Sequence, residues 1–255
     1  FRFDGHRLYC LQAGEDERQG GALLYIGLNR PLDLTVQSRE SPSPMHFVAL
    51  AREIDPTVWI DIEKPFWWDV PCWLASGKMN SVGLANNHMN RSGMFVSEAW
   101  GRPRDVGQLP PPRGNGFWTQ QIYYHILESG IRIPPSAGSA SGVLKNPVGY
   151  NRVYVHLGEK EFSRESWFEG LAAGRCFVTN GPLLQVTADG EHPGATLRLD
   201  DGRSRSVPVH IRLASKDPIS AFELIYNGRV VRRISCSADT QQTLSAQFEC
   251  DQPGW

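Results

Sequence analysis

The chain has 255 residues, of which 40% are hydrophobic and 21% charged, and its formal net charge at pH 7 is -1. This composition excludes a disordered or fibrous chain, and the interspersed charges disfavour a nucleic-acid partner. No apolar run approaches the roughly 18 to 20 residues that cross a bilayer, so we expect a soluble chain without a membrane span.

The first 182 residues alternate short apolar runs with helical stretches, and this pattern predicts an α/β domain with many parallel strands. The predicted strands cover residues 8–12, 22–28, 57–62, 81–85 and 152–156. The predicted helices cover residues 45–54, 119–129 and 163–173. Residues 64–77 and 86–118 form long loops rich in Trp, Pro and Gly, and loops of this length are more often functional than accidental.

The composition changes after Pro182. Turn-forming pairs at 189–190, 201–202 and 227–228 separate alternating runs, as is typical of antiparallel strands. We therefore predict two domains, an α/β domain over residues 1–182 and a small β-domain over residues 183–255. Because Phe1 is no start methionine and the chain stops just after a strand-like segment, we expect both ends to be cut from a longer chain.

An apolar strand delivers Asp61 and Glu63 to its end, followed by Lys64 and Pro65. Side chains two positions apart point to the same side of a strand, so the two acids lie together. Paired acids at a strand end bind a metal or carry out acid–base catalysis, and Lys64 can neutralise them. The alternative is a buried ion-pair cluster that fixes the following loop.

Aromatic residues crowd that loop. Trp67 and Trp68, with Phe66 and Trp73 beside them, can form a wall that stacks on a sugar or another flat ligand. Loop tryptophans are also common in protein cores, and a core role is the alternative for these residues.

Two further stretches supply polar side chains. Asn87 and His88 follow the strand at 81–85, where a barrel places ligand or metal groups, although a hydrogen-bonded structural histidine is the alternative. Glu15, Asp16 and Glu17 occupy a predicted Gly-flanked loop, either as carboxylate ligands for a cation or as a solvated turn.

The chain also lacks some common signatures. Residues 132–155 are rich in small residues but lack the ending of a P-loop, and no nucleophile elbow occurs. The five cysteines contain no closely spaced pair typical of structural zinc. Cys236 and Cys250 can either form a disulfide in an oxidising compartment or remain separate thiols.

Residues 171–184, LAAGRCFVTNGPLL, resemble the segment that closes the barrel in PHP-domain metallohydrolases of the CehA/McbA type. Gly14-Glu15 resembles the metal-ligand strand of that family, and Glu63-Lys64-Pro65 stands at its His-Pro motif. Residues 137–142 resemble its late Gly-Ser-Asp-x-His motif. The resemblance implies a distorted (β/α)7 barrel that lacks its N-terminal part, followed by an antiparallel β-sandwich-like domain.

Several ligand positions of the family are replaced. Its late Asp and His fall on Ala140 and Gly142, and its His-Pro histidine falls on Lys64. Another histidine falls near Gly21, and the His-x-His strand that opens such barrels would lie upstream of Phe1. Only Glu15 is carried over, so the resemblance implies an altered metal site or none.

Two functions follow from this sequence. The first is a metal-dependent hydrolase acting on a phosphate, ester or amide bond, in which Glu15, Asp61 and His88 hold zinc, manganese or iron. Glu63, Lys64 and His88 are then the candidate catalytic residues.

The second function is an inactive barrel, with no metal, that binds a carbohydrate or a small anionic ligand. Its candidate ligand-binding residues are Trp67, Trp68, Asn87 and Arg132. The fused β-domain favours a secreted or periplasmic protein over a cytoplasmic one, by fold analogy alone.

Overall fold

The computed structural model describes residues 13–36, 38, 40–200 and 203–255, so the strand predicted at 8–12 lies outside the described residues. The helices are α1 (Pro44–Ile54), α2 (Val70–Ala75), α3 (Gly114–Glu128) and α4 (Arg164–Ala172). The first strands are β1 (Ala13–Arg18), β2 (Gly21–Ile26), β3 (Trp59–Ile62), β4 (Ser81–Ala85), β5 (Met89–Asn90), β6 (Gly93–Met94) and β7 (Pro135–Ala137). The remaining strands are β8 (Arg152–Val155), β9 (Cys176–Thr179), β10 (Leu183–Ala188), β11 (Arg205–Ala214), β12 (Ala221–Tyr226), β13 (Arg229–Ser235) and β14 (Gln241–Cys250).

The fold is mixed α/β with more strands than helices. Its largest sheet has the order β1-β2-β3-β4-β7, and it is open at both edges within the described residues. Only the pairs β3–β4 and β4–β7 are parallel, whereas β1–β2 and β2–β3 are antiparallel. The expectation of many parallel strands was therefore wrong, and the described strands close no barrel.

The acidic stretch at Glu15–Glu17 is a strand and not the predicted loop. Gly21, with a φ of 137°, closes a hairpin between β1 and β2, and it leaves room for Trp67 to pack over the turn. Within β1, Asp16 and Arg18 point to one side and bond each other through two contacts of 2.7 Å. Glu15 and Glu17 point to the other side, because successive side chains alternate along a strand.

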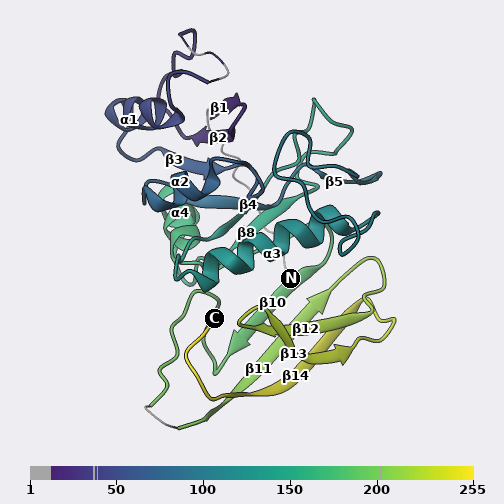
Figure 1. The fold of residues 1–255 in the computed structure, drawn as a ribbon. Coiled ribbons are helices and arrows are strands. Elements are labelled where there is room, and N and C mark those ends of the chain that lie inside the picture. The colour runs from purple at the N-terminus through teal and green to yellow at the C-terminus, as the bar shows by residue number, and fades with distance from the viewer. Residues whose placement is uncertain (1–12, 37, 39, 201–202) are drawn as a thin grey trace.

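The two faces of the sheet have different surroundings. Leu23, Tyr25, Ile60 and Ile62 are fully buried in a hydrophobic cluster to which α1, α2 and α3 contribute. Their sequence neighbours on β2 and β3 point to the opposite face. Apolar side chains of these helices thus cover one face of the sheet, and side chains of the other face line a cavity. Figure 1 shows the helices and the strands of this sheet.

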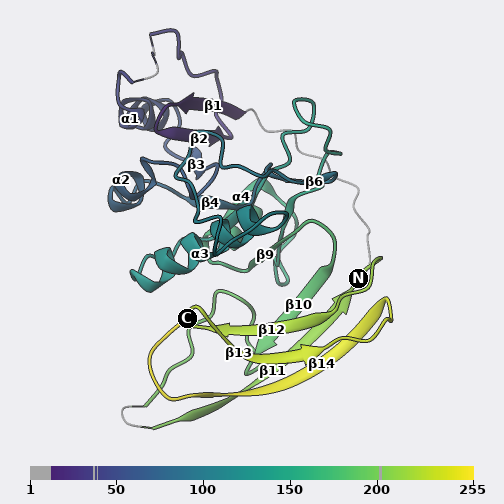
Figure 2. The same ribbon diagram turned by 45° about the vertical axis from the view of Figure 1, so that its right-hand side comes forward.

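Helix α3 lies between the large sheet and the β-rich C-terminal segment in both ribbon views (Figures 1 and 2). Ile122 and Ile126 pack into the cluster beneath the sheet. On another side of the helix, Tyr124 meets the ring of Trp255 with 5.0 Å between ring centroids. The helix begins five residues before the predicted start at 119.

The C-terminal segment contains the antiparallel sheet β10-β11-β14 and the hairpin β12-β13. Side chains of both pack around Val207, Val209 and Ile211 in a second hydrophobic cluster. The hairpin predicted at Asn227-Gly228 is confirmed, and both residues have the positive φ that a tight two-residue turn needs.

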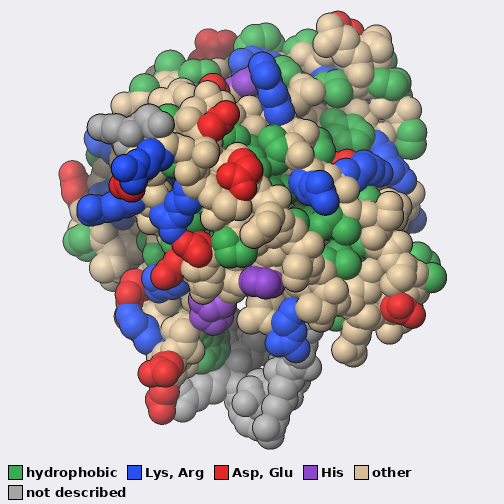
Figure 3. Space-filling view, turned by 90° about the horizontal axis from the view of Figure 1, so that it is seen from below, with side chains coloured by type: hydrophobic (Ala, Val, Ile, Leu, Met, Phe, Trp, Pro, Cys, Tyr) green, Lys and Arg blue, Asp and Glu red, His purple; other side chains and the backbone are tan. Residues whose placement is uncertain are grey.

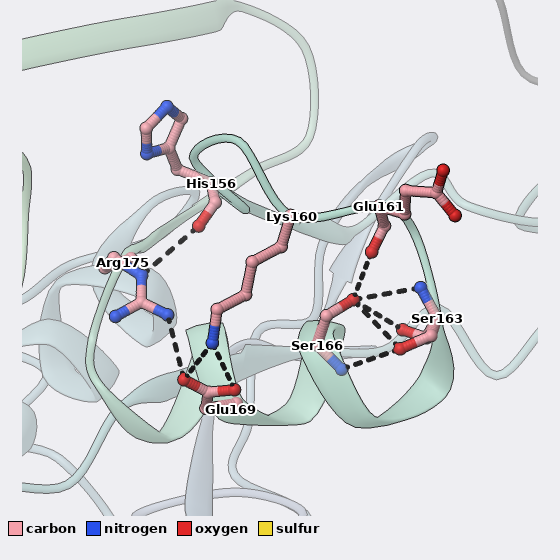
Figure 4. Close-up of polar contacts among 7 residues, drawn as sticks. All are labelled: His156, Lys160, Glu161, Ser163, Ser166, Glu169 and Arg175. Atoms are coloured by element: carbon pink, nitrogen blue, oxygen red, sulfur yellow. Dashed lines mark hydrogen bonds and ion pairs between the residues drawn. The ribbon is translucent and has the colours of Figure 1, made fainter.

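The strand prediction at 81–85 is confirmed by β4, and the helix prediction at 163–173 by α4. At the start of α4, Ser163 and Ser166 cap each other, and Glu169 lies between Lys160 and Arg175 further along (Figure 4).

Viewed from below, acidic and basic side chains are scattered among one another on the surface (Figure 3). None of the described helices is long and apolar enough to cross a membrane.

Candidate functional site

A cavity of about 520 Å³ lies over the face of the large sheet that the helices α1 to α3 leave free. Its floor consists of strand side chains that sit opposite one another in the registers of β1, β2, β3, β4 and β7. These floor residues are Glu15, Glu17, Leu24, Ile26, Trp59, Asp61, Ser81, Gly83 and Ser136. Loops after β3 and β4 and side chains of α4 complete the walls.

Asp61 is buried in the floor of this cavity. Its Oδ1 accepts hydrogen bonds from Ser81 Oγ and Ser136 Oγ, each at 2.5 Å, and Trp59 Nε1 donates to Ser81 Oγ. Burial raises the pKa of Asp61 to about 6, the serine hydrogen bonds oppose this shift, and nearby Glu63 adds to it. Asp61 is therefore a carboxylate held in place by two neighbouring strands.

Glu63 and Lys64 form a buried ion pair directly after β3. Their side chains are 13% and 4% exposed, and Lys64 Nζ contacts Glu63 Oε2. The other carboxylate oxygen accepts from Asn87 Nδ2 at 3.3 Å. Lys64 Nζ also lies 4.8 Å from the centre of the Trp67 ring, a cation–π contact. An ammonium thus occupies the acidic part of the cavity.

His88 is held between the rings of Phe66 and Phe95, at centroid distances of 5.2 and 5.1 Å. Its Nδ1 lies 3.1 Å from the carbonyl oxygen of Ser97, and because a carbonyl only accepts, Nδ1 carries the proton. Burial and the charge of Lys64 lower the pKa of His88 to about 4. The ring is therefore neutral at pH 7, with a lone pair on Nε2.

Glu15 lies in the part of the cavity floor that the edge strand β1 forms, and part of its side chain is exposed to solvent. Partial burial and the neighbouring carboxylates of Glu63 and Glu17 raise its pKa to about 7, and Lys64 opposes this shift. Neighbouring carboxylates repel one another, so Glu15, Glu17 and Glu63 ionise together less readily than isolated glutamates do.

Aromatic rings form much of the remaining wall. Trp67 stacks on Trp100 with ring centroids 5.5 Å apart, and Trp59 stacks on Phe168 at 4.9 Å. Three buried polar atoms of lining residues have no hydrogen-bond partner: Glu63 Oε2, which is in the ion pair with Lys64, Nε1 of Trp67, which is 1% exposed, and Oδ1 of Asn87. An unpaired donor and an unpaired acceptor in one cavity suit a ligand that offers both.

Most of the residues predicted from the sequence meet in this cavity. They are Glu15, Asp61, Glu63, Lys64, Trp67, Asn87 and His88. Phe66 and Trp73 belong to the hydrophobic core beneath the sheet, as the alternative interpretation of the aromatic loop predicted. Trp67 is 1% exposed and belongs to the same core, while it also lines the cavity.

Two predicted ligand-binding residues lie elsewhere. Trp68 is 52% exposed, donates from Nε1 to the carbonyl oxygen of Trp100 and does not line this cavity. Arg132 follows α3, does not line the cavity, and hydrogen-bonds Thr196 and Gly194 in the C-terminal segment. Asp16 is also outside the cavity, in its pair with Arg18.

Sequence reasoning missed Trp59, Ser81 and Ser136 in the floor, and Trp100, Trp167 and Phe168 in the wall. Trp59 precedes Asp61 by two positions, so strand alternation was the signal that could have found it. Nothing near Trp167 or Phe168 in the sequence indicates that α4 packs over this face.

The residues present do not fit a metal ion of the kind the family resemblance implies. Among the described residues, no group of three or more His, Cys, Asp and Glu side chains could hold one. Ala140 lines the cavity without a donor atom, and Lys64 brings a positive charge to the acidic groups. An ammonium at that position repels a divalent cation.

The cysteine alternatives are also resolved for the described residues. Cys236 and Cys250 are both free thiols, and Cys250 Sγ lies 3.1 Å from the hydroxyl of Tyr226. Cys10 lies outside the described residues.

No protein-family model, curated protein or solved structure matches this chain. The geometry and chemistry of the cavity are therefore the basis for inferring a function.

Proposed function

We propose that this chain is a degenerate relative of the PHP-type hydrolases, a partial barrel with a β-sandwich-like domain, that binds a small polyhydroxylated molecule such as a sugar. The order of the sequence motifs supports the relationship. The parallel strands β3, β4 and β7 are compatible with part of such a barrel. The binding function depends on the cavity alone.

The observation that carries the proposal is the position of Lys64. Its ammonium pairs with Glu63 in the cavity, where the family resemblance places a metal-binding histidine. A positive charge supplied by the chain itself offsets the acidic groups without a metal ion. The cavity therefore has walls and polar groups for a ligand, while its described residues include no set of donors for a metal ion.

The walls favour a sugar over an apolar ligand. Aromatic faces such as Trp100 and Phe168 pack well against the C–H groups of a sugar ring. Hydroxyl groups both donate and accept, so they can satisfy Asn87 Oδ1 and Trp67 Nε1 at once. A cavity of about 520 Å³ lies within the usual range for small-molecule sites.

A small anion, the other ligand expected from the sequence, is disfavoured by the same cavity. Glu15, Glu17 and Asp61 line it without a cation partner among the described side chains. Arg132, one of the predicted ligand-binding residues, lies outside it.

The test is calorimetric titration of the full chain with a panel of neutral mono- and disaccharides, in the wild type, Trp67→Phe and Trp68→Phe. Both variants keep an aromatic ring and lose one indole N–H. We expect Trp67→Phe to weaken sugar binding about threefold to tenfold, the effect of one hydrogen bond, and Trp68→Phe to leave it unchanged. Absence of binding to every sugar, or equal effects of the two variants, would overturn the proposal.

A second candidate function is hydrolysis of a phosphate, ester or amide bond by acid–base chemistry. It is favoured by the pKa of Glu15, raised to about 7, because a group that titrates near the working pH transfers protons efficiently. Chromogenic phosphate, ester and amide substrates test it directly. Turnover by the wild type that disappears in Glu15→Gln would support hydrolysis, and turnover unaffected by that change would exclude Glu15 as the proton-transfer group.

A further inference from the structure

We infer that the ligand of this site is an oligosaccharide, whose chain extends from the cavity past Trp100 into a second hollow beside it. This inference rests on the proposed function, since it names the class of sugar that the site prefers. It follows from the side chains that the two spaces share and from the position of two exposed indole rings.

A hollow of about 820 Å³ adjoins the cavity at the end of β1. Among the described residues, Glu17 and Trp100 line both the hollow and the cavity, so the two spaces meet at these side chains. Each space is within the usual size range of a small-molecule site. One pyranose ring is small beside either of them, so a ligand that occupies both needs several linked rings.

Two tryptophans give the hollow its aromatic surface. Trp68 is 52% exposed, Trp100 is 51% exposed, and both line it. Nε1 of Trp68 already donates to the carbonyl oxygen of Trp100 at 2.9 Å, so the ring face is what Trp68 offers to a ligand. Aromatic faces pack well against the C–H groups of a sugar ring. This observation is independent of the unpaired atoms in the cavity, and it points to a second position for a sugar.

Contacts within the chain hold the walls of the hollow in place. The backbone N–H of Asp69 donates to the carbonyl oxygen of Gly20 at 3.0 Å, which ties the β1–β2 turn to the loop after β3. A Cβ at Gly20 would overlap the Asp69 carboxylate, so glycine permits this close approach. Together with the bond from Trp68 to Trp100, these contacts join three segments around one space. A site that is already ordered loses less entropy when a ligand binds.

Polar side chains complete the lining of the hollow. Gln19, Glu40 and Asp69 contribute amide and carboxylate groups, which can bond to sugar hydroxyls because a hydroxyl both donates and accepts. Arg18, the basic side chain among the described lining residues, is already paired with Asp16. The free carboxylates therefore favour a neutral oligosaccharide over an acidic one.

The experiment is calorimetric titration of the full chain with two length series, glucose to cellotetraose and glucose to maltotetraose. In one of the series we expect the affinity to rise about threefold to tenfold with length, the effect of one more ring stacked on an aromatic face. Trp68→Ala should lose most of this gain. Trp68→Phe keeps a ring without the bond to Trp100 and should retain most of it. Phe117→Ala removes a 50% exposed ring of α3 that lines neither space, and this matched control should retain all of it.

The outcomes separate the two proposals. If no member of either series binds more tightly than the tightest monosaccharide of the neutral panel, the oligosaccharide inference is wrong while the sugar-binding function stands. Binding of no sugar in the panel or in either series overturns the function and the inference with it. The inference is also wrong if Trp68→Ala keeps the gain, or loses no more of it than Trp68→Phe or Phe117→Ala does.

Discussion

The two parts of the molecule bury their polar groups very differently. Within the described residues, every buried polar or charged side chain lies before residue 167, and the unpartnered buried polar atoms lie there as well. After residue 183, the buried positions are apolar and alternate along β11 with more exposed ones, as in Val207, Val209 and Ile211. The C-terminal segment thus separates core from solvent by simple strand alternation.

The large sheet uses the same alternation for another purpose. Its β2 and β3 strands place Leu23, Tyr25 and Ile60 in the core, and they place Asp61 and Trp59 under the cavity. Both faces are therefore buried, one by helices and one by polar loops. Buried polar groups without full pairing are costly, and Glu63, Trp67 and Asn87 contribute such atoms to the cavity lining, which indicates a site rather than a scaffold.

The largest expected effect contrasts a buried ion pair with an exposed one. Lys64→Met leaves Glu63 buried without its cation, and we expect the free energy of unfolding to fall by about 3 to 5 kcal/mol. Arg233→Met breaks the pair with Glu223, whose partners are 62% and 38% exposed, and should cost about 0 to 1 kcal/mol. Urea denaturation at pH 7 measures both.

The double variant Lys64→Met with Glu63→Gln removes the stranded charge and should recover much of the lost stability. Equal losses in Lys64→Met and Arg233→Met would show that the two parts of the chain do not differ in this way.

The next expected effect is the pH dependence that buried Asp61 gives to the free energy of unfolding. Since burial raises the pKa of Asp61 from 3.8 to about 6, the native chain holds a proton between these values that the unfolded chain has released. The contribution of Asp61 to the free energy of unfolding is therefore fully present below pH 4 and is lost as the pH rises through 6. The loss is at most about 3 kcal/mol.

Asp61→Asn keeps an oxygen for Ser81 and Ser136 but cannot ionise, so its free energy of unfolding should depend less on pH between 4 and 7. Denaturant unfolding at several pH values measures this, with Asp189→Asn in the C-terminal segment as the control. An identical pH dependence in wild type and Asp61→Asn would contradict the proposed linkage.

The third and smaller expected effect is on the affinity of the cavity for Zn²⁺ in variants of Lys64. Lys64→His removes the ammonium that repels a cation and adds an imidazole beside Glu63 and Asp61. We expect Zn²⁺ binding to strengthen about tenfold or more over the wild type in calorimetric titration. Lys64→Gln, which removes the charge without adding a nitrogen ligand, separates the two causes. Unchanged Zn²⁺ affinity in Lys64→His would argue against the role assigned to Lys64.

The smallest expected effect tests whether the C-terminal core is independent of the cavity. Ile211→Val removes one methyl group from the second hydrophobic cluster and should cost about 0.5 to 1.5 kcal/mol. Sugar affinity should stay the same, because none of the cavity lining comes from β11. A change in affinity measured on the folded variant would show that the two parts are coupled.

Local signals predicted much of this fold. Alternation located β4 and β8, the Ser163 and Gly174 signals bounded α4, and Asn227-Gly228 predicted its hairpin. The acidic strand β1 escaped prediction because its alternating Asp16 and Arg18 are buried as a pair, which charge alone does not reveal. The absence of a closed barrel among the described strands depends on strand pairing, which no local pattern encodes.

The site was predictable where neighbouring positions supply it. Asp61, Glu63 and Lys64 share one strand end, and Asn87 and His88 follow the adjacent parallel strand, so sheet geometry brings them together. Trp68 and Arg132 were misplaced because the side on which a loop residue points depends on tertiary packing. The contribution of α4 to the wall is equally a long-range event.

The ion pair of Lys64 has one further consequence. A bound metal ion exchanges with its surroundings, so the charge of a metalloprotein's pocket varies with supply, chelators and competing ions. The ammonium of Lys64 is covalently attached and cannot leave. The positive charge that faces the carboxylates of this pocket is therefore part of the chain itself and does not depend on the supply of metal ions.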